Sequence, residues 1–294
     1  MTDYLVSQAD DGRRLREVLR GSMRISFTAM KRAKWNGKIL LNGTQAAVDR
    51  RVRAGDRIQV VFPEAVPAYD AVPFDLPLTV PYEDSFLMVV DKPAPLASQS
   101  SAGHPRQSLE NAVYAYLGRP EGFVYRPVNR LDRGTSGLMV IAKDGHTQDL
   151  MQRQLHTEDF LREYLALTEG VPEPAEGVID LPVAKENAAS VKREVRSDGQ
   201  PARTAYRVLE VRGSRALVRL KLFTGRTHQI RVHLSAIGCP VCGDFLYGTE
   251  LPEEFPGRFA LHSAYLTLVH PLTRQKIQLE SLPSWIHAAS SLSD

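Results

Sequence analysis

Short apolar runs alternate with polar turns over the first 63 residues of the chain. Two stretches with helical spacing, at 14–20 and 28–35, precede strand-like runs at 39–43 and 57–62. Turn signals separate these runs at Asn36-Gly37, Asn42-Gly43 and Gly55-Asp56. The pattern predicts a small α/β domain over residues 1–63.

Residues 64–80 are rich in proline and alanine. Proline fixes its own backbone and lacks the amide hydrogen that a helix needs, so regular structure is disfavoured here. We therefore expect an extended linker over residues 64–80.

Apolar strand-like runs return after this segment, at 86–90, 138–142 and 215–223, and helical segments alternate with them. Ser108 is a candidate N-cap for a helix with one apolar stripe, which is typical of a core-facing helix. The pattern predicts an α+β fold for residues 81–290, with a mixed, largely antiparallel sheet flanked by helices.

Basic residues are concentrated near the N-terminus. The 294 residues together carry a net charge of +3, but residues 1–63 hold 13 Lys and Arg against 6 Asp and Glu, a net charge of +7. The rest of the chain holds 24 against 28, a net charge of −4. This asymmetry is typical of a nucleic-acid-binding module, and a solvated basic face on an ordinary domain is the alternative. Lys31, Arg32 and Lys34 on the second predicted helix could follow a phosphate backbone.

The sequence gives no sign of a membrane segment or of a metal site. No apolar run approaches the roughly 20 residues that span a bilayer, and the N-terminus lacks an apolar signal. We therefore expect a cytoplasmic protein without a membrane partner. Cys239 and Cys242 lack the further ligands that a zinc site needs, so small apolar fillers are favoured over a metal or redox pair. We expect no metal and no cofactor.

Asp132 lies in the segment RLDRGTSG, residues 130–137, directly before a Gly-rich turn and an apolar strand. Arg130 and Arg133 flank this carboxylate and would keep it ionised, as a nucleophile or base requires. An aspartate before a tight turn more often caps the turn or pairs with an arginine. The segment alone therefore favours the structural role.

A second segment, KLFTGRTHQIRVHL at residues 221–234, predicts a strand, a turn and a helix that Gly238 ends. Amide groups at the helix start beside Arg226 would suit a phosphate, and Arg231 in the first turn could reach a carboxylate. For His228 and His233, hydrogen-bonded packing is favoured over metal binding.

The first 63 residues resemble the S-four-like RNA-binding domain, named after a small-subunit ribosomal protein. The matching positions, over most of residues 12–62, are Arg14-Leu15, Ile25-Ser26, the run from Gly37 to Gly43, and Gly55-Asp56-Arg57-Ile58. The sequence departs from that pattern at Arg16, where an acidic residue is common.

Almost the whole C-terminal part resembles ribosomal large-subunit pseudouridine synthases of the RluA/RluD type. The order and spacing of several short strings carry the resemblance: Tyr82-Glu83-Asp84, Asp91-Lys92-Pro93, Arg130-Leu131-Asp132, Thr135-Ser136-Gly137, Glu163-Tyr164, Thr224 to Arg231, Gly243-Asp244, Tyr247-Gly248, Leu261-His262 and His270-Pro271. The chain departs from the family pattern at Asn129, Arg162 and Pro95, where histidine, lysine and glycine are usual.

The resemblance implies a pseudouridine synthase fold in which Asp132 is the catalytic aspartate, Tyr164 stacks on the uracil ring and Arg231 pairs with Asp132. Without the resemblance, Tyr164 would be an ordinary core position of a strand. The implied substrate or RNA contacts are Arg130, Arg133, Thr135, Arg226, His228, Gln229, Leu261, Lys31, Arg32 and Lys34.

We therefore expect a monomeric, cofactor-free enzyme that isomerises uridines in structured RNA. Large-subunit ribosomal RNA is the expected substrate. Transfer RNA is the alternative substrate. A non-catalytic RNA-binding factor of ribosome assembly is the main alternative function, and an RNA hydrolase would need a metal cluster or a histidine pair that the sequence does not offer.

Overall fold

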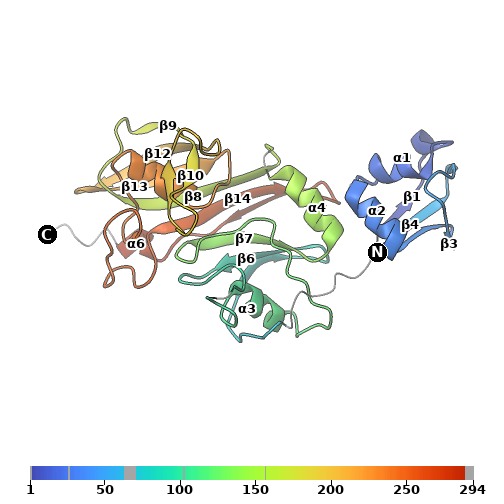
Figure 1. The fold of residues 1–294 in the computed structure, drawn as a ribbon, viewed down its shortest axis with the longest axis horizontal. Coiled ribbons are helices and arrows are strands. Elements are labelled where there is room, and N and C mark those ends of the chain that lie inside the picture. The colour runs from blue at the N-terminus through green and yellow to red at the C-terminus, as the bar shows by residue number, and fades with distance from the viewer. Residues whose placement is uncertain (1, 26, 63–70, 102, 156, 289–294) are drawn as a thin grey trace.

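The described residues form two large sheets, each with a hydrophobic core of its own, and a two-stranded sheet of β10 (Val183–Lys185) and β11 (Arg193–Val195) (Figure 1). The computed structural model describes residues 2–25, 27–62, 71–101, 103–155 and 157–288. Within these ranges the smaller sheet has four strands and the larger sheet has nine. No helix in the same ranges is long and apolar enough to cross a bilayer.

The smaller sheet has the strand order β1-β4-β2-β3, and two helices pack against it. Val18, Ala33 and Ile58 are fully buried in its core, because each lies on the apolar face of its helix or strand. The predicted helices and strands of this part are confirmed. Their bounds are β1 (Thr2–Leu5), η1 (Gln8–Asp10), α1 (Leu15–Arg20), α2 (Phe27–Asn36), β2 (Lys38–Leu41), β3 (Thr44–Gln45) and β4 (Arg57–Val61).

The chain between the two sheets was predicted as a linker over residues 64–80. Residues 64–70 of this predicted linker lie outside the described residues. The remainder packs on the larger unit: Phe74, Leu76 and Leu78 lie against its core, and the Phe74 amide donates to Asn111 O at 3.2 Å. Apolar residues between the prolines thus tie this segment to the larger unit before residue 81.

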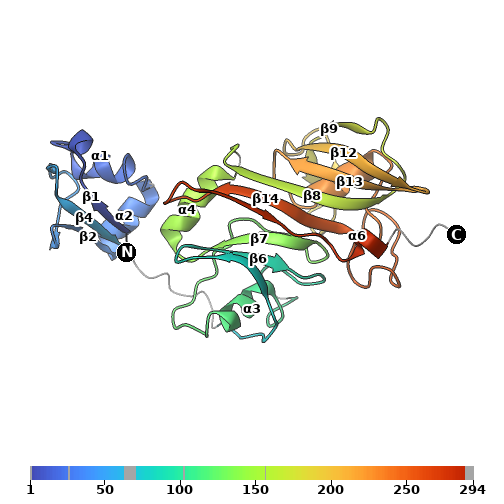
Figure 2. The ribbon, with the colours of Figure 1, turned by 180° about the vertical axis from the view of Figure 1, so that it is seen from behind.

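The larger sheet has the strand order β5-β6-β7-β14-β8-β13-β12-β9, and β15 pairs with β14 (Figure 2). The pair β7 and β14 is parallel and the other pairs are antiparallel, so the predicted mixed, largely antiparallel sheet is confirmed. The strands are β5 (Thr79–Glu83), β6 (Leu87–Lys92), β7 (Ser136–Ala142), β8 (Phe160–Glu169), β9 (Glu176–Asp180), β12 (Arg203–Arg212), β13 (Arg215–Leu222), β14 (Leu261–Val269) and β15 (Lys276–Glu280).

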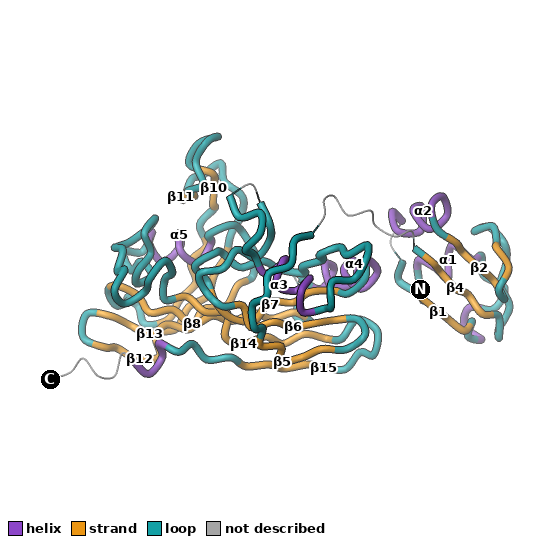
Figure 3. The backbone as a smooth tube through the Cα atoms, turned by 90° about the horizontal axis from the view of Figure 1, so that it is seen from below, coloured by secondary structure: helices purple, strands orange, loops and turns teal. Residues whose placement is uncertain are grey.

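Helices α3, α4 and α5 pack against this sheet, and the small hairpin of β10 and β11 projects from it (Figure 3). Ser108 caps α3 as predicted, since its hydroxyl accepts from the Asn111 amide at 3.4 Å. The bounds are α3 (Leu109–Tyr116), α4 (Gly145–Gln154), β10 (Val183–Lys185), β11 (Arg193–Val195), α5 (Gln229–Ala236) and α6 (Trp285–Ala288).

Gly137 allows β7 and β14 to approach each other directly after the Asp132 turn. Its φ is +107°, and a Cβ at this position would lie 2.4 Å from Ser263 O. Both the dihedral angle and the space therefore require glycine. This contact fixes where the chain leaves the turn.

We predict that Gly137→Ala destabilises the protein by about 3 kcal/mol or more, because backbone strain adds to a clash with backbone atoms. Gly213→Ala is the matched control: Gly213 also has a positive φ, of 61°, but nothing lies within 4 Å of its added Cβ. Urea unfolding of both variants measures the difference. Equal losses of unfolding free energy would show that the close approach does not constrain the sheet.

Candidate active site

A cleft of about 690 Å³ brings together segments that are far apart in the sequence. Its walls come from the turn before β7, the first half of β8 and the turn that leads into α5. Asp132, Tyr164 and Arg231 all line it. The three residues that the resemblance singles out therefore share one cavity.

Asp132 lies in a turn that is fixed by hydrogen bonds on both sides. The Thr135 amide donates to Asp132 O at 3.1 Å. The Ser98 hydroxyl donates to Leu131 O at 2.6 Å and accepts from the Leu131 amide at 3.1 Å. With this support the Asp132 side chain remains 25% exposed and lines the cleft.

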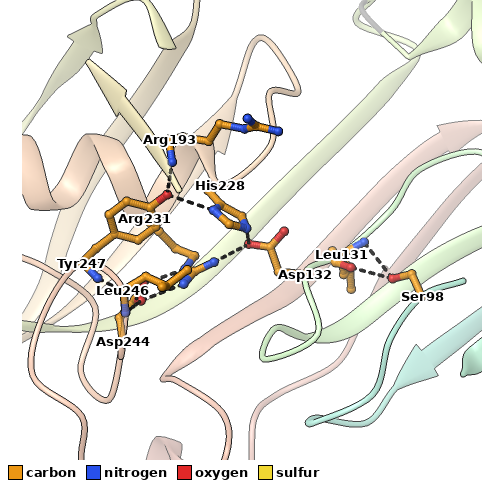
Figure 4. Close-up of polar contacts among 9 residues, drawn as sticks. All are labelled: Ser98, Leu131, Asp132, Arg193, His228, Arg231, Asp244, Leu246 and Tyr247. Atoms are coloured by element: carbon orange, nitrogen blue, oxygen red, sulfur yellow. Dashed lines mark hydrogen bonds and ion pairs between the residues drawn. The ribbon is translucent and has the colours of Figure 1, made fainter. Parts of the chain in front are cut away.

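Arg231 links Asp132 to a second, completely buried carboxylate, Asp244 (Figure 4). Its Nε and Nη2 donate to the two oxygens of Asp244 at 2.6 and 2.7 Å, and its Nη1 donates to Asp132 Oδ2 at 3.1 Å. Burial alone would lower the pKa of Arg231, but its bonds to Asp244 and the charges of both carboxylates raise it. The guanidinium therefore stays charged, and it also lies 4.2 Å from the centre of the Phe259 ring.

A chain of hydrogen bonds sets the tautomer of His228. The Arg193 amide donates to the Tyr247 hydroxyl at 2.7 Å, and that hydroxyl lies 2.9 Å from His228 Nδ1. Burial raises the pKa of Tyr247 and lowers that of His228, so both are neutral at pH 7. Because the Tyr247 oxygen already accepts from Arg193, its own proton can be donated to Nδ1, and the proton of His228 is then on Nε2, which lies 3.9 Å from Asp132 Oδ2.

Both of these side chains approach the same oxygen of Asp132. Arg231 and His228 lie on the side of Oδ2, whereas no hydrogen bond to Oδ1 is formed by the described residues. Figure 4 shows this second oxygen free of contacts among the residues drawn. One oxygen is thus held and the other is available to a ligand.

Tyr164 lies in β8 between Leu220 of β13 and Ser263 of β14. It is 4% exposed and lines the cleft, and burial raises the pKa of its hydroxyl. Leu261, at the start of β14, is also buried and lines the same cleft. A neutral aromatic ring and an apolar side chain thus form part of the wall near Asp132.

The other predicted contacts divide into exposed and buried residues. Arg130, Arg133 and Arg226 are exposed and line the cleft. Thr135 is buried. Gln229 is also buried. Its side-chain amide forms hydrogen bonds with Thr224, Thr204 and the backbone of Arg203 and Arg226, so its polar atoms are used within the protein. Lys31 and Lys34 are exposed on α2, and the side chain of Arg32 lies outside the described part of the structure.

Lys92 is a buried residue to which the sequence pointed only through the string Asp91-Lys92-Pro93. It is 0% exposed, and its Nζ donates to Leu96 O at 2.7 Å and to Pro93 O at 3.0 Å. Burial lowers its pKa to about 7. Asp244 and Tyr247 were likewise quoted in the resemblance without a role, although Asp244 bonds the Arg231 side chain and Tyr247 bonds that of His228.

The described residues contain no group of three or more His, Cys, Asp or Glu side chains that could hold a metal ion. Cys239 and Cys242 are both buried, and burial raises the pKa of Cys242 to about 12. A thiol with so high a pKa is a poor nucleophile at neutral pH.

Comparison with known proteins identifies the fold and the chemistry. The family described as RNA pseudouridylate synthase matches residues 86–236, a range that contains Asp132, Tyr164 and Arg231. The chain belongs to the RNA pseudouridylate synthase family. This synthase is therefore an isomerase that acts on RNA.

Relatives match along most of their length. The uncharacterized RNA pseudouridine synthase YjbO of Bacillus subtilis is 34% identical over 263 residues, which make up 89% of this chain and 92% of that protein. Ribosomal large subunit pseudouridine synthase D of Xanthomonas campestris is 35% identical over 292 residues, with 93% and 86% covered. The solved structure of human RNA pseudouridylate synthase domain containing 1 has a TM-score of 0.58 at 25% identity, covering 72% of this chain and 86% of that one. The pseudouridine synthase fold predicted from the sequence is confirmed.

We predict that the synthase becomes more stable relative to Lys92→Met as the pH rises from 7 to 9. In the unfolded chain Lys92 keeps its proton up to about pH 10.5, while the folded form releases it above about pH 7. Unfolding then takes up a proton, so stability rises with pH, by up to about 1.4 kcal/mol per pH unit.

Urea unfolding at pH 7 and pH 9 measures this difference, and the exposed Lys276→Met is the control that should show no such trend. A stability difference between wild type and Lys92→Met that does not change with pH would contradict the buried, neutral lysine.

Proposed function

We propose that this synthase isomerises uridines in large-subunit ribosomal RNA and that Asp132 starts the reaction. The single observation that carries the proposal is a carboxylate with one oxygen held by Arg231 and the other free, in a cleft that Tyr164 also lines. The match to a protein named ribosomal large subunit pseudouridine synthase D supports the choice of RNA.

The reaction breaks the bond from ribose C1′ to uracil N1 and joins C1′ to C5 of the same base. N1 then carries a hydrogen, and C5 has lost one, so the redox state does not change. The enzyme must attack or deprotonate the sugar, hold the detached uracil and accept the C5 proton. None of these steps requires a cofactor.

Asp132 is suited to the first step because it is charged, oriented and accessible from the cleft. Its free Oδ1 can attack C1′ while the C1′–N1 bond breaks and uracil leaves as its anion, or it can remove a proton from the ribose while the same bond breaks. Both routes start from the same position of the carboxylate. Arg231 holds the other oxygen and compensates the negative charge. Tyr164 would stack on the detached ring, and its neutral hydroxyl suits a proton-transfer role.

A non-catalytic RNA-binding factor would not need this arrangement. Burying Arg231 and Asp244 beside a partly exposed aspartate costs desolvation free energy, and a protein that only binds RNA would gain nothing from that arrangement. The retained geometry of Asp132, Tyr164 and Arg231 therefore favours an active enzyme.

The N-terminal unit is the proposed anchor for RNA outside the cleft. On α2, Lys31 and Lys34 are exposed together with Phe27 and Trp35, and Lys34 Nζ lies 5.1 Å from the centre of the Trp35 ring. Basic side chains bind phosphates, and exposed aromatic rings stack on unpaired bases. The net charge of +7 over residues 1–63 acts in the same direction.

Asp132→Asn is expected to abolish pseudouridine formation while RNA affinity and folding stay nearly unchanged, because the amide has the same shape but is neither a nucleophile nor a base. Single-turnover assays on a large-subunit ribosomal RNA transcript, with mapping of pseudouridine, measure the loss. Asp149→Asn, on the surface of α4, is the control that should keep full activity. Normal turnover by Asp132→Asn would contradict the proposed mechanism.

Lys31→Gln combined with Lys34→Gln should weaken RNA binding and reduce the dependence of log Kd on log salt concentration. Two lost phosphate contacts correspond to a change in slope of about 1.4 to 1.8. Lys276→Gln combined with Arg207→Gln removes the same charge from the larger sheet and should leave the slope almost unchanged. If both double variants behave alike, α2 does not anchor RNA.

A further inference from the structure

Arg162 is a buried arginine without a partner. It lies in β8, two residues before Tyr164, lines the active-site cleft and is 7% exposed. Its Nε is shielded from solvent and has no hydrogen-bond partner, and no carboxylate of the described residues forms an ion pair with the guanidinium. The guanidinium lies over the ring of Phe160, with 5.5 Å between Arg162 Cζ and the ring centre, and this weak cation–π contact does not replace a hydrogen-bonded anion.

This state is unfavourable in the free protein. A guanidinium has five N–H donors, and a buried charge normally has a partner because desolvation is otherwise not offset. Arg231 in the same cleft is equally buried but donates to two carboxylates. The contrast indicates that the missing partner of Arg162 comes from outside the protein.

A second unpartnered donor lines the same cleft. Asn129 is 5% exposed; its Oδ1 accepts from the Val140 amide at 2.9 Å, but its Nδ2 has no partner among the described residues. Both unpartnered groups are donors, so the ligand must supply acceptors. The charged side chains that line the cleft, within the described residues, are five arginines and the carboxylate of Asp132, so the ligand should also be anionic.

We infer that Arg162 binds a backbone phosphate of the RNA strand that carries the target uridine, with Asn129 donating to a second acceptor of that strand. The inference rests on the proposed function, because it places the RNA strand in the cleft of Asp132. A planar guanidinium can donate two parallel hydrogen bonds to phosphate oxygens. A neutral base carbonyl could satisfy a donor but could not compensate the buried charge.

The inference predicts opposite effects on stability and on binding. Arg162→Met replaces an unpaired buried charge by an apolar side chain of similar length, so the free synthase should unfold at a higher temperature. Arg231→Met, which removes a paired buried arginine, should unfold at a lower temperature. A structural role for Arg162 predicts that both variants lose stability.

Binding is measured on the full-length chain with a transcript of large-subunit ribosomal RNA over a range of salt concentrations. Arg162→Met should weaken binding roughly 10-fold or more and lower the salt slope by about 0.7 to 0.9, the value for one phosphate. Arg162→Lys should keep the slope but recover only part of the affinity, since an ammonium lacks the two-pronged geometry. As the control, Arg207→Met removes one exposed charge from β12 and should leave both the RNA affinity and the salt slope unchanged.

The salt slope decides the outcome. A slope for Arg162→Met equal to that of wild type overturns the inference, whatever the unfolding temperature; if the Met variant does not fold, Arg162→Gln carries the same comparison. Failure of the proposed function would appear differently, as a wild-type enzyme that forms no pseudouridine in the transcript. Phosphate contacts do not depend on base sequence, so the slope can still be measured in that case.

Discussion

The two-pronged pairing of Arg231 with Asp244 is the interaction on which the site depends. Asp244 is completely buried, and its Oδ1 also accepts from the Leu246 and Tyr247 amides at 3.1 and 3.3 Å. With its guanidinium plane fixed by this carboxylate, the direction in which Nη1 of Arg231 donates is fixed as well, and Asp132 lies there. Orientation of the proposed catalytic group is therefore set by a residue that never reaches the cleft surface.

The fold supplies the rest of that orientation from distant parts of the chain. Lys92 at the end of β6 binds backbone carbonyls of the loop that follows it, Ser98 binds the backbone beside Asp132, and Gly137 lets β7 approach β14. Arg193 of β11 contributes through Tyr247 to the tautomer of His228. A rigid scaffold of this kind lowers the reorganisation that an enzyme must undergo when it meets its substrate.

The sequence was most informative where periodicity or a short motif acts locally. The helix after the Thr-Gly turn, the Ser108 cap and the strand after the Asp132 turn were all predicted, because each depends on neighbouring residues. The pairing of Arg231 with Asp132 was expected from the family resemblance, and the two lie 3.1 Å apart.

The burial of side chains and their long-range partners could not be predicted from the sequence. Nothing in the sequence distinguishes a buried Lys92 from an exposed one, and the long-range contacts that bury Gln229 or leave Arg162 without a partner depend on how strands and loops meet. The linker expected up to residue 80 ends earlier for the same reason. Phe74, Leu76 and Leu78 pack against a core that forms only in the folded sheet.

The most direct measurement is the single-turnover rate of Asp244→Asn at saturating enzyme. The amide cannot accept two charge-assisted bonds from Arg231, so the guanidinium loses its fixed plane while Asp132 and Tyr164 stay in place. Our account predicts a rate roughly 10- to 100-fold lower, with RNA affinity unchanged because Asp244 does not line the cleft. A folded Asp244→Asn enzyme that forms pseudouridine at the wild-type rate would contradict the account.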